Sequence, residues 1–247
     1  MRIPLLAAAL LLTAPAAASP EVDYGSRQYG AIALDNNWYA QRSAVRDIPV
    51  IGSANVAPAT MRRARMTVRR FLAKAPPSLV RDLWRSGFAV VVIARGETVS
   101  DVPAVGDRFG PDGDARYWGG FGATPALPIA VATEANLMDG TDGENLLVYA
   151  LAGSLAELVL KPKRQSFARE LQAAYDGALA AGRWNQTYAR ATPDTYWAEG
   201  VQSWFGANRV GPRGGDGVHG RVNSARALRA YDPALYRLID RMFGGVT

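Results

Sequence analysis

The chain has 247 residues, of which 49% are hydrophobic and 20% are charged, and it carries a formal net charge of +6. This composition is typical of an ordinary globular protein and argues against extensive disorder. There is no cysteine and only one histidine, His219. These two counts exclude disulfides, a Cys-His nucleophilic pair and a two-histidine metal site, and any Ser-His-Asp triad would have to use His219.

The first residues, "MRIPLLAAALLLTAPAAAS", combine Arg2, a short apolar run and a small-residue Ala-x-Ala pattern at 16–18. These are the three parts of a secretory signal peptide, so we expect residues 1–18 to be removed by cleavage after Ala18. A transmembrane helix needs ~20 apolar residues, and we expect none in this chain. The sequence therefore predicts a bacterial protein that is periplasmic or secreted, and this compartment argues against a nucleic-acid partner.

Residues 19–57 are mixed in character and rich in turn residues, and we interpret them as an N-terminal wrapping segment. Within it, Ile48 to Ile51 predict a short edge strand around Pro49, because proline is confined to edges and bulges of sheets. Residues 58–247 are expected to form one domain.

From Pro58 to Ala75 the apolar residues recur with helical periodicity, and Pro58 stands near the first turn. The opposite face of this helix carries five arginines: Arg62, Arg63, Arg65, Arg69 and Arg70. Two interpretations are open. The arginines form a solvated face, or they contact an acidic surface of the cell envelope.

The remaining elements follow in chain order. The stretch "SLVRDLWRSG" predicts a helix that ends at Gly87, "FAVVVIA" and "IAVAT" predict strands, and residues 95–127 between these strands form a long Gly-, Asp- and Pro-rich loop. Further helices are predicted in "ENLLVYALAGSLAELVL" (144–160), "SFARELQAAYDGALAAG", "PDTYWAEGVQSWFG", "NSARALRAY" and "DPALYRLIDRMF", the last with Asp232 as N-cap and Pro233 at N1. Strands followed by helices predict an α+β fold, with a small mixed sheet in the N-terminal half and a mostly helical C-terminal half.

The helix at 144–160 carries Tyr149 and Gly153 four residues apart, hence on one face, with Ala150 beside them. Zinc peptidases have His-Glu-x-x-His at such a place: the two imidazoles hold the metal and the glutamate is the general base. This chain has Tyr-Ala-Leu-Ala-Gly instead.

Three flanking stretches resemble a secreted branch of the lethal-factor-like zinc metallopeptidases. "TYWAEGVQSWF" preceded by "GRWNQTYARATPD" is similar to their downstream helix, where Tyr-x6-Glu supplies a catalytic tyrosine and the third zinc ligand. "RYWGGFGATP" with "ATEANL" resembles their Gly-Gly loop and Glu-x-Asn-Leu segment, and "VNSARALRAYDPALYRLI" resembles their C-terminal tail. The resemblance covers about residues 48–243 and implies a zincin-like fold.

Carried over residue by residue, the resemblance implies a site without ligands. Tyr149 and Gly153 replace the two histidines, Ala150 replaces the general base, and Thr195, seven residues after Tyr188, replaces the third ligand. Tyr188 and the outer carboxylate Glu199 are retained. The plain alternative is that Tyr149, Ala150 and Gly153 are ordinary core residues.

We therefore expect no zinc and no other cofactor, because a metal ion here would meet no imidazole. Without metal-bound water and a base, hydrolysis by the family mechanism should be absent. The sequence favours a pseudopeptidase that keeps a cleft for a peptide or protein partner. The candidate cleft residues are Glu134, Asn136, Trp197 and Gln202.

A second hypothesis is an active hydrolase that uses carboxylates and Tyr188 on peptides or an envelope polymer. Glu199 lies among aromatic residues, and desolvation there should raise its pKa; the alternative is a structural buried carboxylate. His219 lies in a Gly-rich loop and is expected to be exposed or lightly bonded.

Overall fold

The computed structural model describes residues 37–117, 119–139 and 143–244. The expected signal peptide and residues 19–36 of the wrapping segment lie outside these ranges. Within them, no helix is both long and apolar enough to cross a bilayer.

Five strands form one mixed sheet in the order β1-β2-β3-β5-β4. The strands are β1 (Gln41–Val45), β2 (Ile48–Gly52), β3 (Ala89–Ile93), β4 (Gly120–Phe121) and β5 (Ile129–Thr133). The pairs β2–β3 and β3–β5 are parallel, whereas β1 and β4 run antiparallel to their neighbours at the two edges.

Both faces of the sheet are covered, which is why its inner strands are continuously apolar. Alternate residues such as Val90 and Val92 join a core that includes helices α1 (Pro58–Lys74), α2 (Pro77–Arg85) and α5 (Leu146–Leu155). Their neighbours Val91 and Ile93 face the segment 99–121 instead. That segment contains η1 (Val99–Asp101), η2 (Gly106–Phe109) and α3 (Gly113–Arg116).

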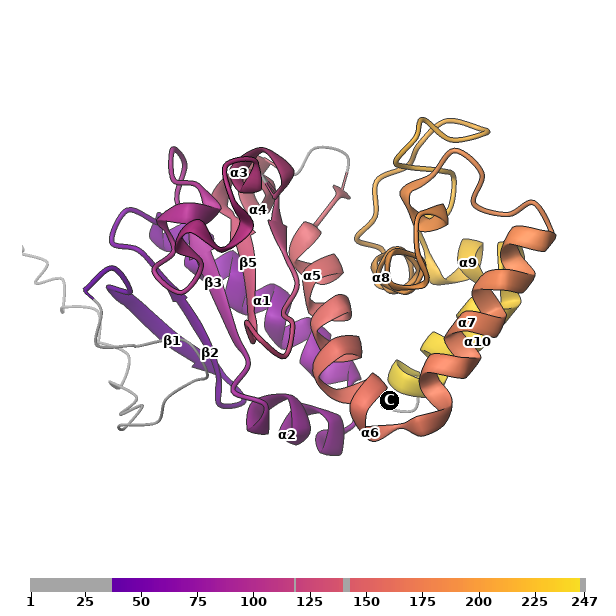
Figure 1. The fold of residues 1–247 in the computed structure, drawn as a ribbon, viewed down its shortest axis with the longest axis horizontal. Helices are drawn as coiled ribbons and strands as arrows, with labels where there is room; N and C mark the ends of the chain where they lie inside the picture. The colour runs from indigo at the N-terminus through magenta and orange to yellow at the C-terminus, as the bar shows by residue number, and fades with distance from the viewer. Residues whose placement is uncertain (1–36, 118, 140–142, 245–247) are drawn as a thin grey trace, which may run out of the picture.

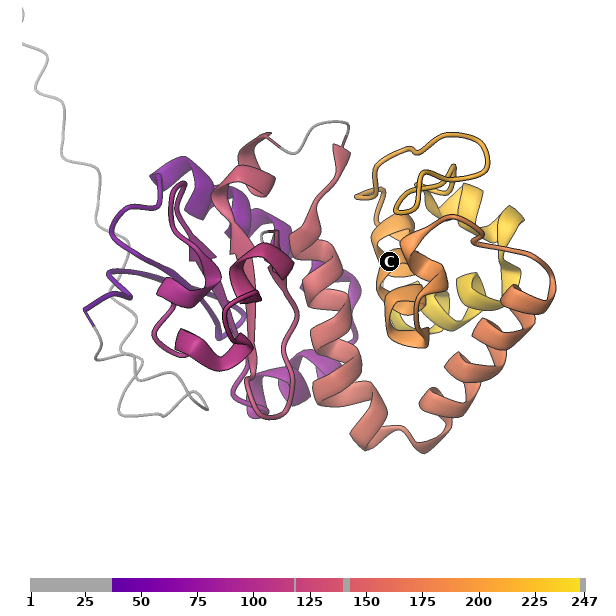
Figure 2. The same ribbon diagram turned by 45° about the horizontal axis from the view of Figure 1, so that its top comes forward.

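The C-terminal half is helical, as the sequence predicts. After α4 (Glu134–Asp139) and α5, the chain continues through a π-helical segment η4 (Ala156–Leu160) and α6 (Lys161–Lys163). It then forms α7 (Gln165–Ala180), η5 (Tyr188–Arg190), α8 (Pro193–Trp204), α9 (Ala225–Tyr231) and α10 (Pro233–Phe243). Figures 1 and 2 show α5 between the sheet and these later helices, so it belongs to both halves of the molecule.

The α+β prediction is confirmed, and so is the N-cap of α10, where Asp232 accepts from Leu235 N at 3.2 Å. Two predictions of detail are wrong. Ile48–Gly52 is not an edge strand, because β1 covers its outer side and β3 its inner side. Residues 144–160 are not one regular helix, because the α-helical pattern gives way to a π-helical turn at Ala156.

Candidate functional site

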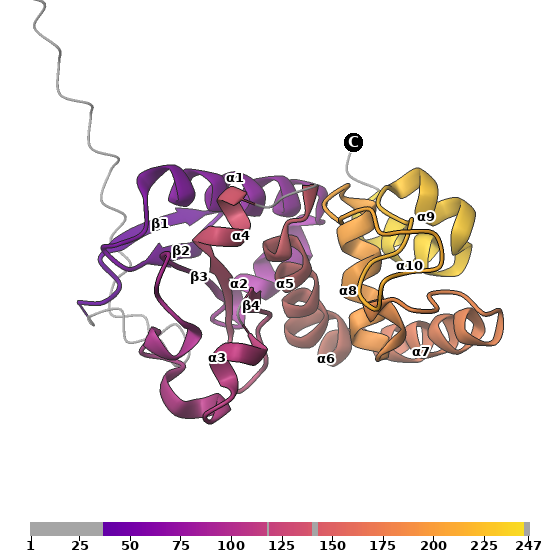
Figure 3. The same ribbon diagram turned by 90° about the horizontal axis from the view of Figure 1, so that it is seen from above.

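Helices α5 and α8 pack closely side by side and bring the sequence-predicted site residues together (Figures 1 and 3). The contact is fixed by Trp197, whose indole Nε1 donates to the carbonyl oxygen of Ala152 at 3.0 Å. Both partners of this hydrogen bond are buried, so α8 is held in one register against the turn of α5 that carries Gly153.

Tyr149 faces Tyr188, with ring centroids 6.3 Å apart and the ring planes tilted by 33°. Burial is the main cause that raises the pKa of the Tyr149 hydroxyl far above its usual value, and the nearby Tyr188, Glu199 and Asp194 raise it further. The phenol therefore stays protonated at every physiological pH. Tyr188, Glu199 and Asp194 therefore lie near enough to the Tyr149 hydroxyl to act on it electrostatically.

The other two α5 positions differ in the space around them. A Cβ added to Gly153 would meet no atom within 4 Å, so this half-buried glycine leaves open room beside the helix. Ala150 is buried, and its carbonyl oxygen accepts from Ser154 Oγ at 2.7 Å. Gly122, the residue after β4, passes close to the same carbonyl oxygen. A Cβ atom at this position would lie only 2.8 Å from it. Ala123 N donates to Ser154 Oγ at 2.8 Å.

Thr195 has a structural role at the start of α8. Its backbone N donates to Thr192 Oγ1 at 3.1 Å, and its own Oγ1 accepts from Thr192 N at 2.9 Å, which completes a capping box. The same hydroxyl lies 2.8 Å from the Thr192 carbonyl oxygen, to which it donates. All hydrogen bonds found for this side chain thus stay within the helix cap.

Glu199, one turn further along α8, is buried and accepts from Asn208 Nδ2 at 2.8 Å. Burial raises the pKa of its carboxyl to about 7; Glu144 raises it as well, whereas Asn208 and His219 lower it. The sequence-based expectation of a raised pKa at Glu199 is confirmed.

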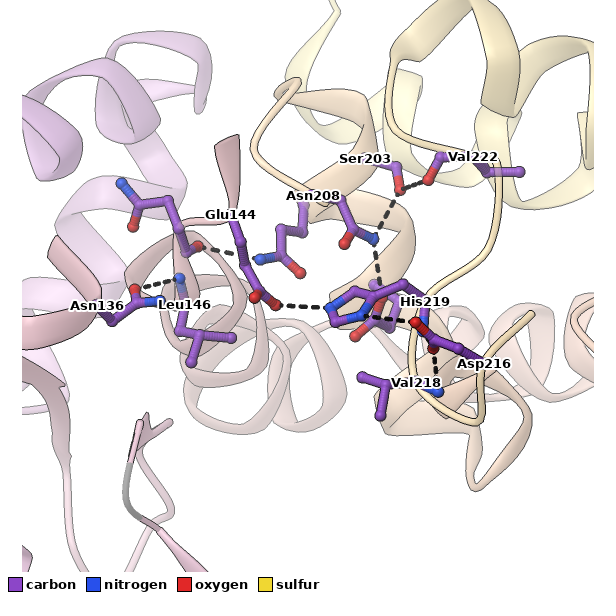
Figure 4. Close-up of polar contacts among 12 residues, drawn as sticks. Asn136, Glu144, Leu146, Ser203, Asn208, Asp216, Val218, His219 and Val222 are labelled. Atoms are coloured by element: carbon purple, nitrogen blue, oxygen red, sulfur yellow. Dashed lines mark hydrogen bonds and ion pairs between the residues drawn. The ribbon is translucent and has the colours of Figure 1, made fainter. Parts of the chain in front are cut away.

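His219 is also buried, so the prediction of an exposed or lightly bonded histidine is wrong. Its Nε2 lies 3.0 Å from Glu144 Oε1, and its Nδ1 lies 3.9 Å from a carboxylate oxygen of Asp216. Figure 4 shows the imidazole between these two acids, one from the segment before α5 and the other from its own loop. Sequence reasoning missed Glu144 and Asn208, because neither belongs to a motif and each contact depends on the tertiary fold.

Three of the candidate cleft residues do not line an open cleft. Trp197 and Gln202 have no exposed surface, and Glu134 is buried against the start of α1, where it accepts from Thr60 Oγ1 and Ala57 N. Asn136 is half-buried and lines a cavity beside α1, and its Oδ1 accepts from Leu146 N at 2.8 Å at the beginning of α5. Trp197 and Gln202 of α8 are buried by helix packing, and periodicity alone cannot distinguish such residues from those that line a cleft.

The open surface lies instead at Tyr188, whose side chain is 47% exposed. It borders a wide hollow of about 760 Å³ formed by residues 185–188, Arg190, Ala191 and Gly217. The Gly-rich loop holds this wall in place, because Tyr188 N donates to Val218 O at 2.8 Å and Gly217 N donates to Gln186 O at 2.9 Å.

The residues present do not fit the zinc that the sequence resemblance implies. Position 149 has a buried, protonated phenol, and position 153 is a glycine. The hydroxyl group at position 195 is hydrogen-bonded within the cap of α8. Over the described ranges, no group of three His, Cys, Asp or Glu side chains is placed to hold a metal ion.

No family model matches the sequence, and no curated protein matches it. Among solved structures, the fold is similar to that of the Pro-Pro endopeptidase PPEP-2 from Paenibacillus alvei. The TM-score is 0.52 at 15% sequence identity, and the match covers 78% of this chain and 97% of that chain. The chain therefore has a peptidase-like fold.

Proposed function

We propose that this protein is an exported pseudopeptidase: a degenerate relative of the lethal-factor-like metallopeptidases that binds a peptide or an extended protein segment without cleaving it. The similarity to a Pro-Pro endopeptidase supports the fold, and the three flanking motifs support the ancestry. The signal-like N-terminus supports export.

The observation that carries this proposal is the arrangement of α5 and α8. Tyr149 lies against Tyr188 and close to Glu199, as expected if these positions descend from a metal site, yet positions 149, 153 and 195 lack metal-binding side chains. Hydrolysis in such a site needs a water whose pKa a metal lowers and a base that takes its proton. Positions 149, 153 and 195 offer no ligand set, and the methyl group of Ala150 cannot take a proton.

Two features support the binding of a peptide. The hollow beside Tyr188 offers an exposed aromatic ring and peptide groups of the 185–188 segment. β4 is one of the two edge strands of the sheet and continues directly into Gly122, against α5. An extended peptide can add to such an edge through backbone hydrogen bonds, while a neighbouring pocket receives a side chain.

The proposal is tested by measuring binding and cleavage of the same peptides. Fluorescent peptides from an unbiased library are titrated by anisotropy and then analysed by mass spectrometry, with and without a chelator. We expect binding that the chelator leaves unchanged and that weakens in Tyr188→Ala, with every peptide intact. Met66→Ala, which shortens an exposed side chain on α1, is the matched control and should bind normally. Chelator-sensitive cleavage would contradict the proposal.

Glu199 favours one second candidate, a metal-independent hydrolase. A carboxyl group with a pKa of about 7 can act as an acid or a base near neutral pH, and Tyr149 responds electrostatically to both Glu199 and Tyr188. Turnover of an envelope polymer that Glu199→Gln abolishes would support this candidate. Unchanged turnover in that variant would exclude Glu199 as its acid.

A further inference from the structure

A separate cavity of about 310 Å³ lies where α1, α4, the start of α5 and the end of α8 meet. Its lining is mostly polar. The apolar part includes the half-buried Phe205 and the buried Val148 and Phe71, and the stacked rings of Phe71 and Phe205 have centroids 5.1 Å apart. None of the site positions 149, 153, 188, 195 and 199 lines it. The cavity is therefore distinct from the surface beside Tyr188.

Two cationic side chains also line the cavity. Arg63 and Arg70 are seven residues apart on α1, hence on the same face after two turns, and Thr67 lies between them. Across the described part of the chain, neither guanidinium has a hydrogen bond or an ion pair. Glu144 also lines the cavity, but within the described ranges it forms no ion pair with either arginine, and its Oε1 lies 3.0 Å from His219 Nε2.

Unpaired guanidinium groups beside an aromatic ring favour a ligand that has both an anionic group and an apolar group. Guanidinium is a planar donor that matches a carboxylate, and the half-buried ring of Phe205, which stacks on the buried Phe71, offers a surface for an apolar group. Known ligand pockets begin at roughly 300 Å³, so this one has room for a single small ligand or one terminal residue.

We propose that this cavity binds a carboxylate attached to an aromatic or branched apolar group. The carboxylate lies between Arg63 and Arg70, and the apolar group lies against Phe205 and Val148. A free aromatic or branched organic acid and the C-terminal residue of a peptide share this chemistry. The inference does not depend on the proposed function, because no residue of the Tyr188 surface takes part.

The test uses the full-length protein and three probes: N-acetyl-phenylalanine, N-acetyl-phenylalanine amide, and a tetrapeptide that ends in phenylalanine with a free carboxylate. Binding is followed by chemical-shift perturbation and calorimetry at low ionic strength. We expect the acid to bind and the amide to bind at least about fivefold more weakly, since it loses the charged hydrogen bonds. A tetrapeptide that binds more tightly than the acid assigns the site to peptide ends, and equal affinities assign it to free acids.

Arg63→Gln and Arg70→Gln should each weaken binding of the acid by about three- to tenfold. Arg62→Gln and Arg69→Gln make the same charge change on the same helix but do not line the cavity, and they should bind normally. Unfolding curves confirm that all four variants are folded. An equal loss in all four, equal binding of the amide, or no binding of the acid by the folded wild type would each overturn the proposal.

Discussion

Glu199 shows how one side chain responds to the packing around it. The carboxyl is buried on α8, and Asn208 donates one hydrogen bond to it. One hydrogen bond replaces only part of the hydration that a carboxylate has in water, so the charged form is disfavoured. This explains why the pKa of Glu199 rises to about 7 although His219 lies near enough to oppose the change.

A pH dependence of stability follows from this residue. Because the pKa of Glu199 is raised from 4.5 to about 7 on folding, the folded protein holds this proton more tightly than the unfolded chain does. The resulting stabilisation is complete below pH 4.5 and is lost as the pH rises through 7. In Glu199→Gln this loss should disappear, so the difference in unfolding free energy between variant and wild type should change by about 2–3 kcal/mol between pH 4.5 and 8. Urea unfolding at several pH values measures it, and parallel curves for the two proteins would refute it.

The burial of Glu199 could be predicted from the sequence because aromatic residues flank it within one helix, whereas its hydrogen-bond partner Asn208 could not. The environment of His219 could not be predicted either. Its contact with Glu144 joins residues 75 positions apart, between a Gly-rich loop and the segment before α5. Neither segment has a periodic pattern, so only the tertiary fold brings the two side chains together.

At the scale of elements, two glycines within helices have opposite reasons to be there. Gly153 on α5 faces open space, whereas a Cβ on Gly200 of α8 would lie 2.5 Å from Leu235 Cδ2 and 3.0 Å from Ile239 Cδ1. Helix α10 therefore packs directly on the backbone of α8. At Gly153, by contrast, packing does not require a glycine.

A matched pair of variants tests this difference. Gly153→Ala should stabilise the protein by about 0.5–1 kcal/mol, because alanine has the higher helix propensity and its methyl group meets nothing. Gly200→Ala has the same propensity gain but should destabilise by about 1–3 kcal/mol, because the methyl group overpacks two buried side chains. Thermal unfolding of both variants decides the matter. Equal changes in the unfolding temperature of both variants would contradict close packing of α10 on the backbone of α8.

Long apolar or periodic segments were predictable, and short irregular ones were not. β3, β5, α1 and α10 follow from runs and caps that local chemistry determines. β4 has only two residues within a Gly-rich loop, and it exists because its pairing with β5 continues the sheet. The place of β2 inside the sheet likewise depends on β1, which lies in the segment expected to wrap around the domain.

For the molecule as a whole, the fold and the chemistry of the site are separable. The architecture is similar to that of a solved endopeptidase at only 15% identity, because packing between elements such as α5, α8 and the sheet tolerates many apolar combinations. A metal site tolerates few, because it requires particular donor atoms at three fixed positions. In this chain positions 149, 153 and 195 carry no such donors, and α5 and α8 pack together with Tyr149 facing Tyr188.

The most direct test of this account is a calorimetric zinc titration of chelator-treated protein. The positive control is a variant with Tyr149→His, Ala150→Glu, Gly153→His and Thr195→Glu; the open space at Gly153 gives the new imidazole room. We predict no tight stoichiometric zinc in the wild type, one equivalent in this variant, and weaker binding when Thr195 is left unchanged. One tightly bound equivalent in the wild type, lost on replacement of Thr195, would contradict the account.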